Sequence, residues 1–297
     1  MPSSGSRSAA APGPPLGVGV VGAGQRGAAR ARHLAANARM RLVGVADADV
    51  ARAEAVAAAC TTTPYASTAL LLDACDVVCV ATPTRDHFLL AEAAAKDGRH
   101  VFLEWPATTS VDECERLVRL GEEAGVEIGV AHPLPIAALL ASRPSGWRPR
   151  LVSLHLPADG LSWPFLLAGA LDLSVALAGS ADLPRLDAEA DRHGALLGTV
   201  AATLRFRSGT LAHLLLGAAV DAPRLFVAGQ GRRATAHRLD APLAFDGDAT
   251  ARPGASAADD GFGGFVTALA TSRPAPRSAL DALRTMRLAE RLLQKLR

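Results

Sequence analysis

The chain has 297 residues, of which 49% are hydrophobic and only 4% aromatic, and its formal net charge is +2. This length supports one large domain or two modest ones, and the nearly balanced charge excludes a dedicated nucleic-acid or membrane-surface binder. The four cysteines form no metal-binding pattern, so we expect no metal site and a reduced, cytoplasmic protein. No apolar run is long enough and free enough of charge to span a bilayer. Residues 1–15 are expected to form a disordered tail.

A short apolar run near the start of the chain ends in three glycines spaced G-x-G-x-x-G, at Gly22, Gly24 and Gly27. Helix formers follow, so the context is the strand, turn and helix of a dinucleotide-binding site. In such a site the first glycine permits the tight turn, the second lets backbone approach a pyrophosphate, and the third lets the helix pack closely on the strand. The pyrophosphate lies at the helix N-terminus. Gln25 and Arg26, which stand between the glycines, are expected to bind the cofactor with them.

A second predicted strand, RLVGVAD, ends at Asp47, twenty residues after Gly27. A carboxylate in this place binds the ribose hydroxyls of the adenosine and repels a 2′-phosphate. We therefore expect NAD(H) to be preferred, with NADP(H) as the alternative cofactor. Asp47 is alternatively a helix cap, a role for which Asp49 is the competitor.

Strand and helix patterns alternate up to about residue 134. Buried-strand runs at 76–83, 100–106 and 126–132 are separated by helices, two of which we expect Ser67 and Ser110 to cap. Together with the strands before them, these runs predict a six-stranded, doubly wound parallel sheet of the Rossmann type over residues 16–134.

Polar side chains follow the ends of these predicted strands, at the edge where cofactors lie in such folds. Thr82, Pro83 and His87 follow the fourth strand and are expected to bind the cofactor, with a structural hydrogen bond as the alternative for His87. Glu104 ends a buried strand. A carboxylate there needs a partner, so we expect Glu104 on the nicotinamide side of the cofactor.

Three further side chains are candidates for the reaction itself. Trp105 either walls off a planar substrate or fills the core. His132 ends the sixth strand and is the candidate proton donor, and a satisfied loop residue is the alternative. Asp172 lies within an apolar helix, which indicates either a carboxylate that faces the site or a buried ion pair with an arginine.

From about residue 135 the pattern changes to strand-like runs joined by turns, with one helix over 165–179. This pattern predicts an α+β domain with a largely antiparallel, open sheet over residues 135–297, so the chain as a whole is α/β followed by α+β. Residues 246–262, rich in Gly, Ala and Asp, are expected to form a mobile loop. Arg232 and Arg233 are expected in a solvated turn.

The segments VGVVGAGQRG, LVGVADADVARA and CVATPTRDHFLLAEAAAKDGRHVFLEWP together resemble the glucose–fructose oxidoreductase / inositol dehydrogenase / MocA family (Gfo/Idh/MocA). The segment ALDALRTMRLAERL resembles that family's closing helix, which implies that a last helix at about 278–297 packs back on the Rossmann domain. The resemblance implies an NAD(P)-dependent oxidoreductase with a small-molecule substrate. It also implies a second domain that covers the nicotinamide and forms a homodimer or higher homo-oligomer.

Two departures from the family pattern matter for the chemistry. The E-K-P motif reads E-W-P at residues 104–106, and Ala176 stands where the resemblance places a histidine four residues after Asp172. The chain is similar here to the biliverdin-reductase-like branch, which carries E-Y-P and reduces a conjugated acceptor. The resemblance therefore implies hydride transfer between nicotinamide and a small cyclic or conjugated substrate, held between Trp105, His132 and Asp172.

The missing lysine and histidine leave two other functions open. One is a redox-neutral elimination or isomerisation that uses a tightly held NAD. The other is a non-catalytic protein that binds dinucleotide as a sensor or a partner subunit.

Overall fold

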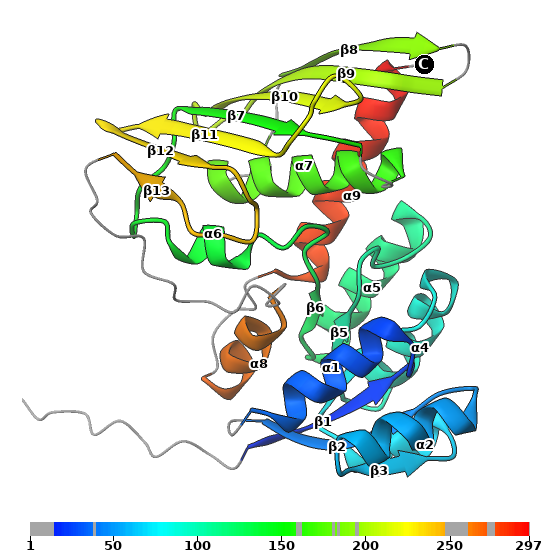
Figure 1. The fold of residues 1–297 in the computed structure, drawn as a ribbon. Coiled ribbons are helices and arrows are strands. Elements are labelled where there is room, and N and C mark those ends of the chain that lie inside the picture. Colours follow the sequence, from blue (N-terminus) through cyan, green and yellow to red (C-terminus); the bar gives the residue numbers. More distant parts are fainter. Residues whose placement is uncertain are drawn as a thin grey trace, which may run out of the picture.

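The computed structural model describes residues 15–37, 40–158, 162–179, 182, 185–193, 196–246, 261–271 and 277–296. Most of the tail and of the loop predicted from the sequence lies outside these residues. The described elements form two sheets with helices packed on them (Figure 1). One sheet belongs to the first part of the chain and the other to the second part.

The first sheet is parallel throughout and confirms the predicted Rossmann arrangement. Its strands are β1 (Leu16–Val21), β2 (Met40–Ala46), β3 (Thr63–Tyr65), β4 (Val77–Val80), β5 (His100–Leu103) and β6 (Ile128–Val130). Their spatial order is β3-β2-β1-β4-β5-β6. The order reverses between β1 and β4, so the crevice at the carboxyl ends of these two strands is where a ligand binds in open sheets of this kind.

Helices cover both faces of this sheet. They are α1 (Gln25–Ala35), α2 (Val50–Ala59), α3 (Thr68–Ala74), α4 (Thr84–Lys96), α5 (Val111–Ala124) and α8 (Phe262–Ala270). One core cluster joins strand residues such as Val20 and Phe102 to α1 and α8. A second cluster, with Val78 and Val101, joins the opposite face to α3, α4 and α5. A strand buried on both faces needs apolar residues at successive positions, as in the fully buried run Val77–Val80 of β4.

Helix caps follow the sequence with one difference. Ser67 and Ser110 each accept a hydrogen bond from a backbone N–H in the first turn, as predicted. The carboxylate of Glu113, however, accepts from the N–H of Thr109 instead of returning to the cap residue. Asp49 caps α2, so Asp47 is not needed there.

The second sheet has seven described strands in the order β13-β12-β11-β7-β10-β9-β8. They are β7 (Leu151–Leu156), β8 (Arg185–His193), β9 (Leu196–Arg205), β10 (Leu211–Gly217), β11 (Arg224–Gly229), β12 (Arg232–Ala236) and β13 (Ala244–Phe245). Only the pair of β7 and β10 is parallel, which confirms a largely antiparallel sheet. The predicted turn at Arg232 and Arg233 is wrong, because Gln230 and Gly231 make the turn with positive φ and the arginines begin β12.

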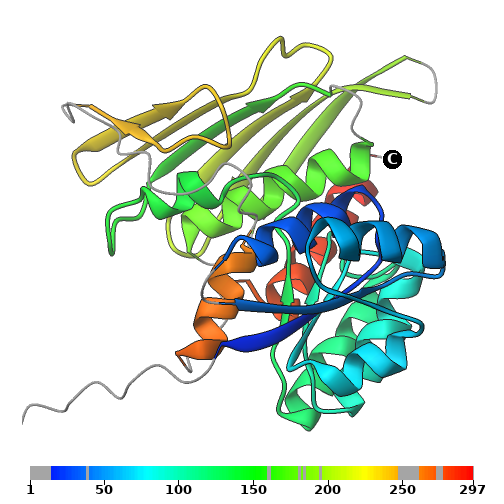
Figure 2. The same ribbon diagram turned by 60° about the horizontal axis from the view of Figure 1, so that its bottom comes forward.

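The described helices of the second half lie on one face of this sheet, between it and the Rossmann sheet (Figure 2). They are α6 (Ala137–Ala141), α7 (Trp163–Ala178) and α9 (Ala279–Lys295). The first half of α9, including Ala282 and Leu283, belongs to the core beneath the Rossmann sheet. Its second half, including Leu288 and Leu292, belongs to the core of the second sheet. One helix therefore ties the two cores together.

Candidate functional site

The glycine turn after β1 has the geometry that a pyrophosphate needs. Gly22 has φ of 98°, a conformation that L side chains rarely adopt. A Cβ on Gly27 would lie 1.7 Å from the carbonyl oxygen of Gly22, so only glycine lets α1 approach the strand this closely. A Cβ on Gly24 would meet no atom within 4 Å. The space beside Gly24 is therefore open, and the backbone there is free to approach a ligand.

A cleft of about 740 Å³ opens beside this turn, at the carboxyl edge of β1, β2 and β4. Its walls include most of the predicted cofactor residues, namely Gly22, Gly24, Gln25, Arg26, Asp47, Thr82 and Pro83. His87 and Glu104 are buried and do not line it. The cleft lies at the topological switch point of the sheet, which is where a dinucleotide binds in this fold.

Asp47 is held in the wall of the cleft by backbone hydrogen bonds. The N–H of Ala23 donates to Oδ2 at 2.6 Å, and the N–H of Asp49 donates to Oδ1 at 2.8 Å. Arg52, whose side chain is 58% exposed, lies 3.5 Å from Oδ1. The carboxylate is thus fixed to the glycine turn, with an exposed cation beside it.

His87 joins the loops that follow β4 and β5. Its Nε2 lies 2.9 Å from the carbonyl oxygen of Thr82, and its Nδ1 lies 2.8 Å from that of Pro106. The hydroxyl of Thr82 is buried and has no hydrogen-bond partner within the described part of the chain. An orphan hydroxyl on the wall of a cleft fits a site that a polar ligand completes.

Glu104 finds its partners on α1. Its Oε1 accepts from Arg30 Nε at 2.6 Å, and its Oε2 accepts from Arg26 Nη1 at 3.3 Å. Arg26 also donates to the carbonyl oxygen of Trp105 at 3.2 Å. Glu104 therefore holds Arg26, a cleft residue, against the end of β5.

The structure brings His132 and Asp172 together from β6 and α7, forty residues apart. His132 Nδ1 lies 2.7 Å from Asp172 Oδ2, and the side chains are 9% and 6% exposed. Burial alone would raise the pKa of Asp172, but the charge of Arg277 and the hydrogen bond from His132 outweigh burial and hold that pKa below its usual value. Asp172 is therefore ionised and engaged on both sides, so the buried ion pair with an arginine is realised, and a role facing the site stays a prediction.

Arg277 is the site residue that the sequence does not reveal. Its Nε donates to Asp172 Oδ1 at 2.8 Å, and its Nη1 donates to the carbonyl oxygen of Ala131 at 2.9 Å. Its guanidinium lies 5.1 Å from the ring centre of Trp105, which is itself buried. The chain separates Arg277 from Asp172 by 105 residues, and no local pattern marks one arginine among many as the partner of a buried carboxylate.

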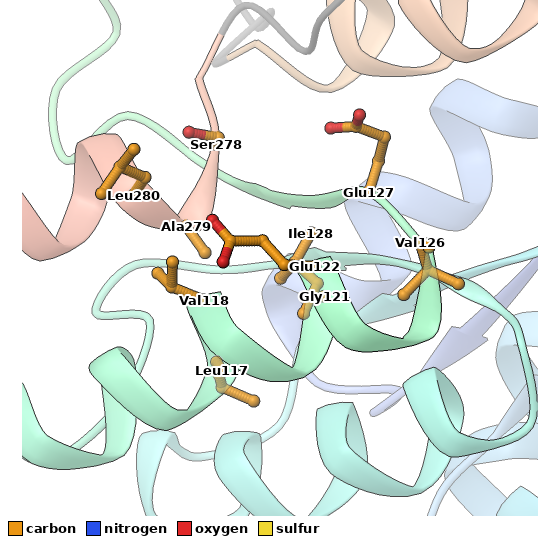
Figure 3. A pocket seen from close by; sticks show the side chains of 11 residues that line it. Leu117, Val118, Gly121, Glu122, Val126, Glu127, Ile128, Ser278, Ala279 and Leu280 are labelled. Carbon is orange, nitrogen blue, oxygen red and sulfur yellow. The ribbon is translucent and has the colours of Figure 1, made fainter.

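A second hollow, of about 380 Å³, lies away from this site, between the end of α5, the start of β6 and the start of α9 (Figure 3). Most of its lining residues are apolar, and Glu122 and Glu127 also line it. None of the predicted site residues lines it. Among the described residues no cluster of metal-ligating side chains occurs. No helix in the described part of the chain is both long and apolar enough to cross a membrane.

In a Rossmann sheet of this kind, a cleft at the topological switch point is where a dinucleotide binds. Residues 16–132 match the model of the GFO_IDH_MocA family, described as an oxidoreductase family with an NAD-binding Rossmann fold. The first part of the chain, residues 16–132, is therefore similar to this Gfo/Idh/MocA family.

Three known proteins are similar to the chain. The chain is 28% identical over 244 residues to UDP-N-acetylglucosamine 3-dehydrogenase of Acidithiobacillus ferrooxidans, over 76% of this chain and 75% of the relative. A solved structure of that enzyme superposes with a TM-score of 0.83 at 25% identity and covers 95% of this chain and 98% of its own. Inositol 2-dehydrogenase of Rhizobium meliloti is 32% identical over 118 residues, 38% of this chain and 34% of the relative. GenD2 from gentamicin A biosynthesis, solved in complex with NAD, shares the fold with a TM-score of 0.74 at 18% identity, over 98% of this chain and 97% of its own.

Proposed function

We propose that this protein transfers hydride between NAD(H) and a small cyclic substrate, and that the pair His132–Asp172 moves the accompanying proton. The observation that carries the proposal is the 2.7 Å contact between His132 Nδ1 and Asp172 Oδ2, at the carboxyl edge of the Rossmann sheet. The pair supplies a proton-transfer group where the E-W-P motif lacks a lysine and α7 carries Ala176.

The cleft residues support a nicotinamide dinucleotide. The open space at Gly24 suits the pyrophosphate at the start of α1, and the buried hydroxyl of Thr82 lacks a partner that a ligand would supply. Asp47 is placed for the adenosine ribose, and its charge disfavours a 2′-phosphate. We therefore propose NAD(H) over NADP(H). When bound, the cofactor supplies the hydride acceptor or donor.

The protein's own contribution is proton handling. In the direction of oxidation, the substrate hydroxyl gives its proton to His132 Nε2 while its carbon gives up hydride, and the products are a ketone, a reduced cofactor and a protonated His132. In the direction of reduction His132 returns that proton to the carbonyl oxygen. Asp172 holds Nδ1, so Nε2 is the nitrogen left for exchange, and a positioned group of this kind contributes about 10²- to 10⁴-fold to a rate.

The relatives favour a ring as substrate, because one is named a UDP-N-acetylglucosamine 3-dehydrogenase and another an inositol 2-dehydrogenase. Trp105 stands where the family motif has a lysine, but its side chain is buried in the core cluster that α9 shares with the Rossmann sheet, so it does not favour one substrate class over another. Cyclic alcohols and ketones are therefore the first class to test. Linear conjugated acceptors are the second class, on the likeness of E-W-P to E-Y-P.

We propose in addition that the protein is a homodimer or higher homo-oligomer. The face of the second sheet opposite α7 carries the half-buried side chains of Leu151, Leu211, Leu215 and Phe226. No described helix lies on that face. Sedimentation equilibrium tests this, and a monomer at micromolar concentration would contradict it.

The function is tested by following the nicotinamide absorbance of the purified protein with NAD+ and a panel of cyclitols and nucleotide sugars, and with NADH and conjugated acceptors. We expect turnover with a member of the ring class and a loss of about 100-fold or more in His132→Gln. Tight dinucleotide binding without turnover on any substrate would favour the non-catalytic alternative. Substrate conversion without a net change in absorbance would favour the redox-neutral one.

A further inference from the structure

Arg277 lies outside the cleft. It contacts both segments that carry the pair His132–Asp172, namely the end of β6 and α7. It enters from the segment before α9, where its carbonyl oxygen accepts from the N–H of Val130 in β6 at 3.2 Å. Its side chain is 3% exposed and reaches Asp172 of α7 with Nε at 2.8 Å and Nη2 at 2.6 Å. Three segments distant in the sequence are therefore joined by one guanidinium.

We infer that Arg277 is a positioning residue, which orients the Asp172 carboxylate and offsets its charge so that His132 can both take up and release a proton. This inference rests on the proposed function for its catalytic meaning. A lone buried carboxylate against an imidazole would favour the protonated ring, because opposite charges attract strongly where water is excluded. With Arg277 present, the carboxylate and the guanidinium sum to zero charge, so the ring of His132 faces a neutral pair.

The geometry favours arginine over any other cation here. Nε and Nη2 address one oxygen of Asp172, Nη1 addresses the carbonyl oxygen of Ala131 at 2.9 Å, and the flat face lies 5.1 Å from the ring centre of Trp105. A planar fork can make these contacts together, and an ammonium cannot. Because Oδ1 receives the arginine, Oδ2 remains for His132.

Few other groups compete for His132. Among the described residues, Asp172 of α7 contacts the ring of His132. Arg277, from the segment before α9, contacts the other oxygen of Asp172. The start of α8 presents the backbone of Gly261, where an added Cβ would lie 3.4 Å from the ring. Glu104, at the end of β5, is engaged by Arg26 and Arg30.

The test is an NMR titration of the full-length protein with ¹³C-labelled histidine, which needs neither cofactor nor substrate. The chain has eight histidines, and His132→Gln assigns the signal. In Arg277→Gln we expect the titration midpoint of that signal to move to higher pH by about one unit or more, a change of about tenfold in proton affinity. Arg277→Lys keeps the charge but not the planar fork, so we expect its midpoint to lie between those of the wild type and Arg277→Gln. Arg284→Gln, which removes an exposed arginine from α9, leaves the midpoint where it is.

An Arg277→Gln protein that is folded and titrates like the wild type would overturn the inference. If that variant does not fold, the same titration is carried out on Asp172→Asn. It leaves His132 facing the arginine's charge alone, so we expect the midpoint to move to lower pH, and an unmoved midpoint overturns the inference equally. The readout is separate from turnover. A shift in the titration with no effect of His132→Gln on rate would sink the proposed function and leave the electrostatic role of Arg277 standing.

Discussion

At the scale of single residues, Gly24 and Gly27 of the turn differ in what a side chain would meet. A Cβ at Gly27 would strike the backbone of Gly22, whereas a Cβ at Gly24 would enter open space. Backbone cannot move aside as a flexible side chain can, so a side chain at Gly27 would lower the stability of the fold. A side chain at Gly24 would affect only the binding of a ligand beside it.

We expect Gly27→Ala to lower the free energy of unfolding by about 3 kcal/mol or more, since the helix must shift off the strand. Gly24→Ala should fold normally and bind NADH about tenfold more weakly, a loss of about 1.4 kcal/mol, because its methyl group would stand where the pyrophosphate lies. Urea denaturation and NADH fluorescence titration of the two variants check this. Equal effects of both substitutions on stability would contradict the assignment.

We propose that Asp47 sets the preference between NAD(H) and NADP(H). Its carboxylate is held by the N–H groups of Ala23 and Asp49, and the exposed Arg52 lies beside it. Removing the charge in Asp47→Asn leaves Arg52 able to attract a 2′-phosphate. We expect the ratio of NADPH to NADH affinity to rise about tenfold or more, measured by fluorescence titration of each cofactor. A ratio that does not change would show that the carboxylate does not face the ribose.

At the scale of elements, the start of α9 supports the site as well as the helix. Ser278 accepts from the N–H of Asp281, whose carboxylate accepts from the backbone N–H and hydroxyl of Ser278, so the helix begins with a complete capping box directly after Arg277. Ser110 accepts from the N–H of Glu113 at the start of α5, without the return bond of a complete capping box, and it is not next to Arg277 in the chain. The two caps therefore form a matched comparison.

Ser278→Ala and Ser110→Ala should each lower the free energy of unfolding by about 1 kcal/mol. Only Ser278→Ala should also disturb the titration of His132, because it loosens the backbone that carries Arg277. Denaturation curves and the labelled-histidine titration measure the two effects separately. An equal response of His132 to both variants would show that α9 does not position the arginine.

The sequence predicts elements well where local signals suffice. The buried runs and glycine turn mark the Rossmann strands to within a few residues, and Ser67 and Ser110 mark two helix starts. It fails where a contact is made across the fold. Nothing near Arg277 shows that it meets Asp172, and β12 was mistaken for a turn because its exposed edge begins with two arginines, as a loop would.

At the scale of the whole molecule, two cores share one helix and one buried ion pair. The helix α9 contributes to both cores, and Asp172 on α7 is tied to Arg277 at the edge of the Rossmann sheet. Breaking a buried pair by removing one charge typically costs 3–5 kcal/mol, because the remaining charge is left without a partner. The stability of the two cores is therefore coupled through the site.

The same pair makes stability depend on pH in acid. The pKa of Asp172 is lowered on folding from an ordinary value of 3.8, so its stabilisation is complete above that value and is lost as pH falls through the lower folded value. We expect Asp172→Asn to be about 3 kcal/mol less stable at neutral pH and to approach the wild type in strong acid. Urea midpoints across the acid range check this, and a difference that is the same at every pH would contradict it.

Thiol reactivity reports the integrity of both faces of the Rossmann sheet. Burial raises the pKa of Cys75 and of Cys114 to about 11, and Cys79 is buried as well, whereas Cys60 is half-buried. Since the thiolate is the reactive form, we expect only Cys60 to react readily with a disulfide reagent at mildly alkaline pH, and all four cysteines to react in denaturant. Fast labelling of a second thiol in the native protein would contradict the described packing.

The central claim is that His132, held by Asp172, moves the proton in an NAD-dependent hydride transfer that lacks the usual lysine. It is tested most directly by comparing the rate of nicotinamide reduction in the wild type and in His132→Gln, on a cyclic alcohol that the wild type oxidises and at equal cofactor saturation. We expect the variant to bind NADH as tightly as the wild type. Its rate of turnover should fall by about 100-fold or more. A variant that binds the cofactor and turns over at the wild-type rate would contradict the account.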